Sequence, residues 1–352
     1  MKLNEKVVGL CYHGSDGEDL DMVKEAGFNW LRMGVPFPWE DSMYGKLSPQ
    51  YLNARNLIEK CAAKGFKIMV TTPGLGAYRY DHNLKKTIWI DSWPDFVGVK
   101  GTDKFYENVM KTCAWYAQDL EGLVGPLWCN MNEIDIETFH GDYPVEVAAE
   151  TAFWSAKGVV SVDPEALCGI NLSRCYDEGL RVADMAYKAG HCFGYIGDDQ
   201  YFGSWQRYDV ERWTYVIDVL HKRYNLPVLA CEWGYSSGGQ VKAKPSEDVE
   251  IPSGLNSVCY VFGWHHEVEG GHTEEVQAKY IYRGLEIFAK NPHVLGSFLF
   301  CWKDAKYCYH CGREQCPSEC FWGIVDSNLN PKPAYYAVQK AVKDFYKLDK
   351  SN

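Results

Sequence analysis

The feature that most constrains the fold is a regular alternation of two kinds of segment along the chain. Short runs rich in β-branched and aromatic residues recur eight times, and a longer segment with helical periodicity follows each run. This alternation predicts βα units and a parallel sheet. The predicted strands cover residues 7–12, 30–34, 67–72, 126–131, 167–172, 194–198, 228–231 and 296–301. The predicted helices cover residues 19–26, 51–64, 103–121, 144–160, 180–188, 205–223, 273–290 and 334–347.

Eight such units predict a (β/α)8 barrel, an α/β fold of about 250 residues or more. The chain has 352 residues, of which 46% are hydrophobic, and no low-complexity stretch or change of composition marks a domain boundary. We therefore expect residues 1–352 to form a single (β/α)8 TIM barrel, with a cysteine-rich insertion after the eighth strand. The active site of such a barrel lies at the C-terminal ends of the strands.

The charge and the N-terminal residues limit the partners and the compartment that we expect. A formal net charge of −11 argues against nucleic acid and against an anionic membrane surface as partners. No apolar run approaches the ~18 residues that a membrane span needs, and residues 1–10 lack the apolar segment of a secretory signal. We therefore expect a cytoplasmic protein with reduced thiols. The sequence leaves oligomerisation open.

Two glutamates stand at the ends of predicted strands. Glu133 closes the segment LWCNMNE (127–133), and Glu232 follows the segment PVLAC (227–231). Glutamate is a poor strand residue, and it rarely lies in apolar surroundings unless it is paired or functional. Strands four and seven lie roughly across the mouth of a barrel, so both carboxylates are expected to face one cleft. Two such carboxylates are the equipment for cleaving a glycosidic bond.

Both segments resemble signatures of the clan A retaining glycoside hydrolases, a large group of barrel enzymes. Asn132 and Glu133 after an apolar strand resemble the Asn-Glu signature of the clan, and residues 227–234 (PVLACEWG) resemble its strand-seven nucleophile segment. The resemblance covers residues 7–345, approximately. It implies that Glu133 is the acid/base, that Glu232 is the nucleophile, and that Asn132 binds the 2-hydroxyl of the sugar.

Other positions extend the resemblance. Arg32 matches the strand-two arginine of the clan and would hold Glu232 ionised, and Tyr201 matches a tyrosine that hydrogen-bonds the nucleophile. Trp302 matches the aromatic floor under the −1 sugar, and Trp233 is expected to contact the substrate as well.

The end of the third strand departs from the clan pattern. Residues 71–76 (TTPGLG) show no obvious counterpart of the histidine or asparagine that the clan often carries there.

The implied activity is hydrolysis of β-glycosides or short oligosaccharides by double displacement, without a catalytic cofactor. A small carbohydrate is thus the expected partner, and a cytoplasmic location favours exo over endo action. A transglycosidase that uses the same two glutamates is one alternative. A sugar-binding barrel without activity, in which the glutamates are structural, is another. We expect the pKa of Glu133 to be raised by burial and by the charge of Glu232.

The segment 303–325 is rich in cysteine, with the spacing C-x2-C-x4-C-x3-C. Four thiolates so close together in a reducing compartment indicate a closed structural metal site, with zinc as the preferred ion. Two local disulfides, an iron–sulfur cluster or free thiols remain open, and His310 could replace one thiolate. Cys259, like most of the other cysteines, is expected to be a small core residue. The predicted ligands are Cys308, Cys311, Cys316 and Cys320.

Overall fold

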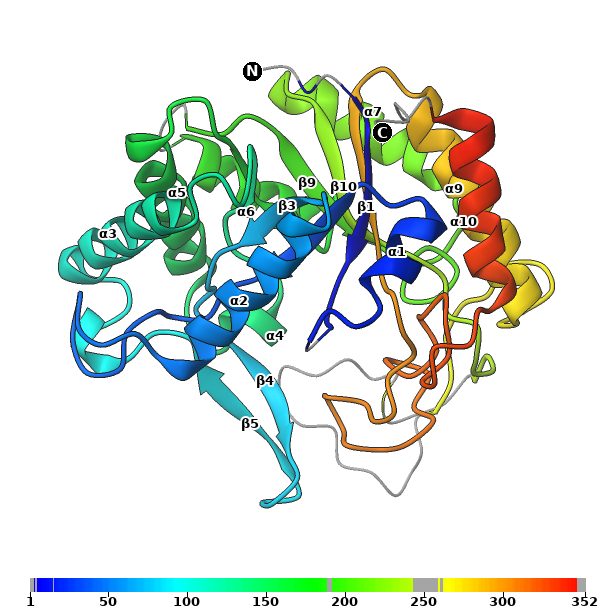
Figure 1. The fold of residues 1–352 in the computed structure, drawn as a ribbon, viewed down its shortest axis with the longest axis horizontal. Helices are drawn as coiled ribbons and strands as arrows, with labels where there is room; N and C mark the ends of the chain where they lie inside the picture. Colours follow the sequence, from blue (N-terminus) through cyan, green and yellow to red (C-terminus); the bar gives the residue numbers. More distant parts are fainter. Residues whose placement is uncertain are drawn as a thin grey trace.

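The parallel sheet is the framework of the molecule. The computed structural model describes residue 3 and residues 5–14, 16–188, 192–242, 259 and 262–346. Within these residues, nine strands form one curved sheet with helices packed around it (Figure 1). The strands are β1 (Val7–Cys11), β2 (Trp30–Gly34), β3 (Lys67–Thr71), β6 (Leu127–Cys129), β7 (Leu167–Gly169), β8 (Asn171–Leu172), β9 (Ile196–Gln200), β10 (Val228–Trp233) and β11 (Val294–Leu299).

The sheet closes through its fifth predicted strand. The strand order is β7-β6-β3-β2-β1-β11-β10-β9-β8, so the two edge strands are neighbours in sequence and only Ile170 separates them. Hydrogen bonds join this point to both sides: the Asn130 N–H donates to the Gly169 carbonyl at 2.7 Å, and the Gly197 N–H donates to the Ile170 carbonyl at 2.8 Å. If β7 and β8 are counted as one strand, the sheet is a nearly closed barrel of eight strands. The predicted (β/α)8 fold class is confirmed.

Helices cover the outside of the barrel, with α3, α5 and α6 on one side in Figure 1 and α9 and α10 on the other. Three helices, which begin at residues 49, 103 and 274, start at side-chain caps. Ser48, Thr102 and Thr273 each accept a hydrogen bond from the backbone N–H three residues further on. The helices are α1 (Leu20–Ala26), α2 (Pro49–Ala63), α3 (Asp103–Asp119), α4 (Glu137–His140), α5 (Val145–Val162), α6 (Asp177–Lys188), α7 (Arg212–Tyr224), α9 (Glu274–Lys290) and α10 (Pro333–Phe345), with a 3-10 turn η1 (Asp95–Val97).

Two apolar cores follow from the alternation of side chains along each strand. The larger core fills the space between sheet and helices. The smaller core fills the barrel, where Cys11, Cys129 and Cys231 are buried beside large side chains such as Trp30 and Phe298. These three cysteines are small core residues, as their apolar segments predict.

A hairpin between β3 and α3 was not predicted from the sequence. Its antiparallel strands are β4 (Gly76–Asp81) and β5 (Lys86–Asp91). The turn is stabilised by Asp81, whose Oδ1 accepts hydrogen bonds from the Asn83 and Leu84 N–H groups at 2.8 and 2.9 Å. Figure 1 shows the hairpin projecting beyond the barrel on the side where the cysteine-rich segment (orange) also lies.

The predicted element boundaries differ from the observed ones by a few residues in most places. The largest difference is in α7, which begins at Arg212 and not at residue 205. The reason is that Ser204, Trp205 and Gln206 fold back in a turn, with their N–H groups directed to the Tyr201 carbonyl. The predicted end of the last helix, Lys347, lies outside the described residues.

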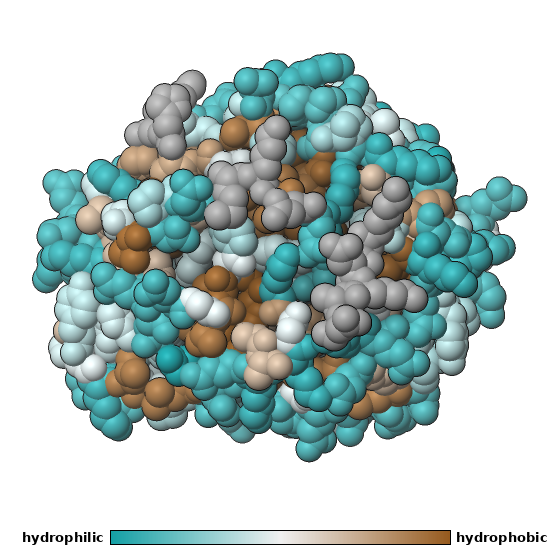
Figure 2. All heavy atoms as spheres, turned by 45° about the horizontal axis from the view of Figure 1, so that its top comes forward, coloured by the Kyte–Doolittle hydropathy of each residue, from teal (hydrophilic) through white to brown (hydrophobic). Residues whose placement is uncertain are grey.

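The surface is mainly polar. The face shown in Figure 2 is mostly hydrophilic, and its hydrophobic side chains are gathered in separate patches. Among the described residues, no helix is both long enough and apolar enough to cross a membrane.

Candidate active site

A cavity of about 580 Å³ opens at the C-terminal ends of the barrel strands. This is within the usual size range of small-molecule sites, and it is the end of the barrel where active sites form. Five of the predicted site residues line the cavity together. They are Arg32, Asn132, Glu133, Tyr201 and Glu232.

Glu232 is held by two partners, one on each oxygen. Arg32, on β2, donates from Nη1 to Oε1 and forms an ion pair with the carboxylate. Tyr201, directly after β9, donates its hydroxyl hydrogen to Oε2 at 2.6 Å. The side chains of Arg32 and Glu232 are 7% and 13% exposed, so water screens this charge pair poorly. The two contacts fix the direction of the Glu232 carboxylate and place the positive charge of Arg32 beside it.

A β-bulge explains why Glu232 faces the cavity. Along β10, Leu229 and Cys231 point into the barrel, whereas Val228 and Ala230 point toward the helices. Strict alternation would turn residue 232 outward. The pairing with β9 shifts register between Ala230 and Glu232, which sets Glu232 opposite Asp199. Bulges of this kind re-aim side chains beside active sites.

The same bulge corrects the prediction for Trp233. Because Glu232 turns inward, the next side chain turns outward, and Trp233 is fully buried between the sheet and α9. Its ring packs edge-on against Phe288, with centroids 4.9 Å apart, and lies close to Gly284. Trp233 does not line the cavity and is a core residue.

An amide network connects Arg32 with the second glutamate. Arg32 Nη2 donates to Asn132 Oδ1 at 2.5 Å, and Asn171 Nδ2 donates to the same oxygen at 3.1 Å. With its oxygen engaged twice, Asn132 directs its Nδ2 toward Glu133 Oε2, 3.4 Å away. Asn171, from β8, also donates to Asp199. The network fixes the Asn132 amide before any substrate enters.

Glu133 lies in a strained segment that begins where β6 ends. Both Met131 and Glu133 adopt left-handed backbone conformations, with φ of 73° and 39°. Such conformations cost roughly 1–3 kcal/mol each outside glycine, and they gather at functional sites. Two hydrogen bonds hold the segment: the Met131 N–H donates to Thr72 Oγ1 at 3.2 Å, and the Glu133 N–H donates to Asn171 Oδ1 at 3.3 Å.

The two glutamates differ in their electrostatic surroundings. Burial raises the pKa of Glu133 well above its usual range, and the negative charges of Glu232 and then Asp135 raise it further. This agrees with the direction and the causes expected from the sequence. Glu232 has an arginine as an ion-pair partner, whereas Glu133 has none among the described residues. The two carboxyls therefore differ in their surroundings, because in the described part of the chain Glu133 is buried without a paired cation whereas Glu232 is paired with Arg32.

The aromatic wall of the cavity differs from the prediction. Trp302 is 3% exposed and does not line the cavity, because its indole Nε1 donates to Asp19 Oδ2 at 2.6 Å and its ring packs near Tyr335. Strand β11 ends at Leu299, so Phe300 is the residue that follows the strand at the cavity. Phe300 and Trp322 line the cavity instead, and each ring meets the ring of Tyr201 edge-on.

Several other lining residues were missed. Ser173 and Phe300 directly follow β8 and β11, so the reasoning that found the glutamates could also have found them. Arg79, Tyr309 and Trp322 come from the hairpin and from the segment after β11, and no signal in the sequence places them there.

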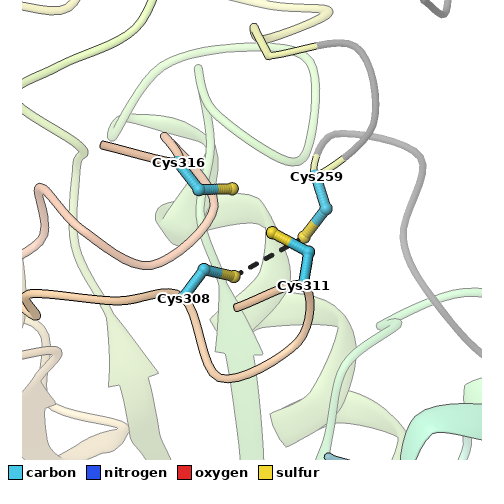
Figure 3. A group of neighbouring side chains, drawn as sticks. All are labelled: Cys259, Cys308, Cys311 and Cys316. Carbon is cyan, nitrogen blue, oxygen red and sulfur yellow. Dashed lines mark hydrogen bonds between the residues drawn. The ribbon is translucent and has the colours of Figure 1, made fainter. Parts of the chain in front are cut away.

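Four buried cysteines form a second cluster next to the cavity. The thiols of Cys259, Cys308, Cys311 and Cys316 all lie within 4.8 Å of one another and point toward a common centre (Figure 3). The Sγ atoms of Cys259 and Cys308 are 3.8 Å apart. A disulfide would bring two sulfur atoms to about 2.05 Å, and all fourteen cysteines are free. The group could hold a metal ion.

This cluster corrects one of the four predicted ligands. Cys320 lies on the turn after Cys316, where its N–H donates to the Cys316 carbonyl and its thiol donates to the Arg313 carbonyl at 3.9 Å. Cys259 takes the fourth place, although it lies 49 residues before Cys308. Spacing along the chain cannot reveal a ligand that only the fold brings near. His310 does not replace a thiolate, because its Nε2 pairs with Glu319 at 3.2 Å.

The cysteine cluster is connected to the cavity wall. Tyr309 and His310 stand between Cys308 and Cys311, and both line the cavity. The Tyr309 carbonyl accepts a hydrogen bond from the Tyr80 N–H at 2.7 Å, and the His310 carbonyl accepts one from the Thr87 hydroxyl at 2.7 Å. The cysteine loop is thereby docked onto the hairpin.

Comparison with known proteins identifies the class of fold. No protein-family model matches the chain, and no curated protein matches it in sequence. Among solved structures, a GH2 β-galacturonidase from Eisenbergiella tayi has a TM-score of 0.58 at 15% identity, with 97% of this chain and 52% of that one covered. A family 39 glycoside hydrolase from Bacteroides cellulosilyticus has a TM-score of 0.62 at 13% identity, with 96% and 64% covered.

A β-D-glucuronidase from Dictyoglomus thermophilum gives similar values, a TM-score of 0.58 at 14% identity, with 97% of this chain and 51% of that one covered. The chain thus spans about half to two thirds of the length of these proteins. The likeness shows the fold alone, which is a TIM barrel similar to those of these glycoside hydrolases.

Proposed function

We propose that the protein is a retaining glycoside hydrolase of clan A that cleaves β-glycosides or short oligosaccharides, with Glu232 as nucleophile and Glu133 as acid/base. One observation carries the proposal: two glutamates at the ends of two barrel strands line one cavity in opposite electrostatic environments. A retaining mechanism requires that contrast, because one carboxyl must donate a proton while the other attacks. Residues 1–352 would form a single catalytic barrel.

In the first step Glu232 attacks the anomeric carbon, and the bond to the leaving-group oxygen breaks as Glu133 transfers its proton to that oxygen. The product is a covalent glycosyl-enzyme. In the second step Glu133, now ionised, takes a proton from water, and the water oxygen displaces Glu232. Neutralisation of Glu232 in the intermediate removes a charge that raises the pKa of Glu133. Glu133 thus becomes a stronger acid between the steps.

Three neighbours would assist these steps. Arg32 and Tyr201 position Glu232 and stabilise its charge in the free enzyme and on departure. Asn132 would bind the 2-hydroxyl of the sugar, with its amide held by Arg32 and Asn171. No catalytic cofactor is needed, since both proton transfers and the attack are assigned to side chains.

We propose a structural zinc ion for Cys259, Cys308, Cys311 and Cys316. The geometry fits: a tetrahedral site with Zn–S bonds of about 2.3 Å places its sulfur atoms roughly 3.8 Å apart, and Cys259 and Cys308 have that separation. Four thiolates close the coordination sphere and leave no open position for chemistry. The ion would join the segment of Cys259 to the loop after β11 and so fix one wall of the cavity.

A panel of aryl β-glycosides tests the catalytic proposal. Wild type should turn over at least one of them, while Glu232→Ala should lose the activity and regain it with azide, giving an α-glycosyl azide. Glu133→Ala should retain the first step on activated leaving groups and slow the second. Glu121→Ala, an exposed glutamate outside the cavity, is the control. Full activity of both site variants, with folding matched by circular dichroism, would refute the assignment.

A further inference from the structure

Arg79 on the hairpin strand β4 is a cation of the cavity wall. Its guanidinium lies over the ring of Tyr309, 4.6 Å from the centroid, and near the ring of Phe139, 5.8 Å away. Nη1 donates to the Tyr78 carbonyl at 3.0 Å. A guanidinium carries five N–H donors, and this is the one hydrogen bond that Arg79 makes within the described part of the chain. No carboxylate there forms an ion pair with it.

Within the described residues, none of the carboxylates that line the cavity forms an ion pair with Arg79. Glu232 forms its ion pair with Arg32, and the Glu319 carboxylate is engaged by His310, whose Nε2 lies 3.2 Å away. Burial raises the pKa of Glu133 well above its usual range, which disfavours a negative charge there. Glu137 also lines the wall, but no ion pair joins it to Arg79. The positive charge of Arg79 therefore faces the cavity without a counterion from these groups.

The surrounding structure holds Arg79 in this place. Across the hairpin it pairs with Ile88 on β5. On the other edge, the Tyr80 N–H bonds to the Tyr309 carbonyl, which fixes the ring of Tyr309 beside the guanidinium. A planar guanidinium that stacks on an aromatic ring keeps its N–H donors free for hydrogen bonds in its plane, and it suits bidentate recognition of a carboxylate.

We propose that Arg79 binds a carboxylate on the substrate, so that the enzyme acts on β-glycosides of a uronic acid. The inference rests on the proposed function and adds the chemical class of the sugar. A neutral sugar would leave the Arg79 charge uncompensated in a partly desolvated site, whereas a carboxylate forms charge-assisted hydrogen bonds with it.

Substrates that differ only at C6 test the proposal. The kcat/KM values are measured for 4-nitrophenyl β-D-glucuronide against the β-D-glucoside, and for the β-D-galacturonide against the β-D-galactoside. In wild type, the kcat/KM of at least one uronide should be higher than that of the corresponding neutral glycoside. In Arg79→Gln that ratio should fall about 10- to 100-fold, as expected for loss of a charged hydrogen bond. Arg212→Gln is a matched control, because the Arg212 guanidinium likewise lies over two aromatic rings, those of Tyr208 and Tyr215, but does not line the cavity.

The possible failures are distinguishable. The proposal of an acidic sugar is wrong if kcat/KM is the same for neutral glycosides and uronides, or if Arg79→Gln slows both equally. The hydrolase proposal stands in either case. If no glycoside is cleaved, the hydrolase proposal fails. Calorimetric titration with D-glucuronate and D-galacturonate, against D-glucose and D-galactose, then decides the carboxylate site alone: binding of a uronate that is lost in Arg79→Gln supports it, and absence of such binding overturns it.

Discussion

The hydroxyl of Tyr201 lies 2.6 Å from Oε2 of Glu232 and donates a hydrogen bond to it. Tyr201 follows β9 and Glu232 ends β10, so the contact depends on the bulge that turns Glu232 into the cavity. The two residues form a unit: the phenol orients the carboxylate, and burial together with the negative charge of Glu232 raises the pKa of the phenol far above its usual range. Tyr201 therefore stays a donor at any working pH.

Replacement of Tyr201 by phenylalanine should reduce kcat/KM by about 10- to 100-fold, because a hydrogen bond to a charged group contributes roughly 1.5–3 kcal/mol. Steady-state kinetics on an activated aryl glycoside would measure the loss. Tyr215→Phe, at an exposed tyrosine of α7, is the control and should behave as wild type. Unchanged kinetics in Tyr201→Phe would mean that Glu232 needs no such partner.

The raised pKa of Glu133 should give activity a basic limb. The acid must be protonated in the free enzyme, so kcat/KM should fall as the pH rises through the pKa of Glu133, which lies above the usual 4.5. Glu133→Gln, assayed on a substrate with a leaving group that needs no proton, should lack this limb. If kcat/KM of the variant falls at the same pH and by the same factor as in wild type, the ionisation belongs to another group.

The same shift makes a prediction for stability. Since the folded state holds a proton on Glu133 that the unfolded state releases, the folded state binds more protons above pH 4.5. The contribution of Glu133 to the free energy of unfolding therefore falls as the pH rises from the pKa of Glu133 in the unfolded state to its pKa in the folded state. Asp198 and Asp199 also have raised pKa values, so the difference between wild type and Glu133→Gln isolates Glu133. Urea unfolding between pH 5 and 8 should show a shallower decline in the variant; parallel curves would contradict the shift.

Most of the barrel was predictable because strand and helix periodicities are local properties of the sequence. Glu133 and Asn132 were found for the same reason, since they lie within four residues of the end of an apolar strand. The direction of a side chain was not predictable where the backbone departs from regular alternation. The bulge before Glu232 has no signature in residues 227–234, and it decides that Trp233 belongs to the core.

Contacts between distant segments were also beyond the sequence. The C-x2-C-x4-C spacing revealed three of the clustered cysteines, whereas Cys259 joins them only through the fold. The strands of the hairpin that carries Arg79 contain strand-forming residues such as Tyr78, Ile88 and Trp89, but the docking of the hairpin on the cysteine loop joins residues 223 positions apart, which no local pattern reveals.

Two cysteine variants distinguish the observed ligand set from the predicted one. Cys259→Ser should lower the zinc content of the purified protein and its Tm, because it removes one of four ligands. Cys320→Ser should keep one zinc per chain, since its thiol lies outside the group. Metal analysis by mass spectrometry together with thermal unfolding measures both. Zinc retained in Cys259→Ser and lost in Cys320→Ser would restore the set predicted from spacing.

The two aromatic residues near the end of β11 should separate function from stability. Phe300 lines the cavity and packs edge-on against Tyr201, so Phe300→Ala should raise KM several-fold or more through lost contact with the sugar and a looser Tyr201. Trp302 is buried away from the cavity, and its indole donates to Asp19. Trp302→Phe should leave kcat/KM nearly unchanged and reduce the free energy of unfolding by about 1–3 kcal/mol, because the Asp19 carboxylate loses its buried donor. Kinetics and urea unfolding of both variants test the contrast. A large loss of activity in a stable Trp302→Phe protein would return this tryptophan to the substrate site.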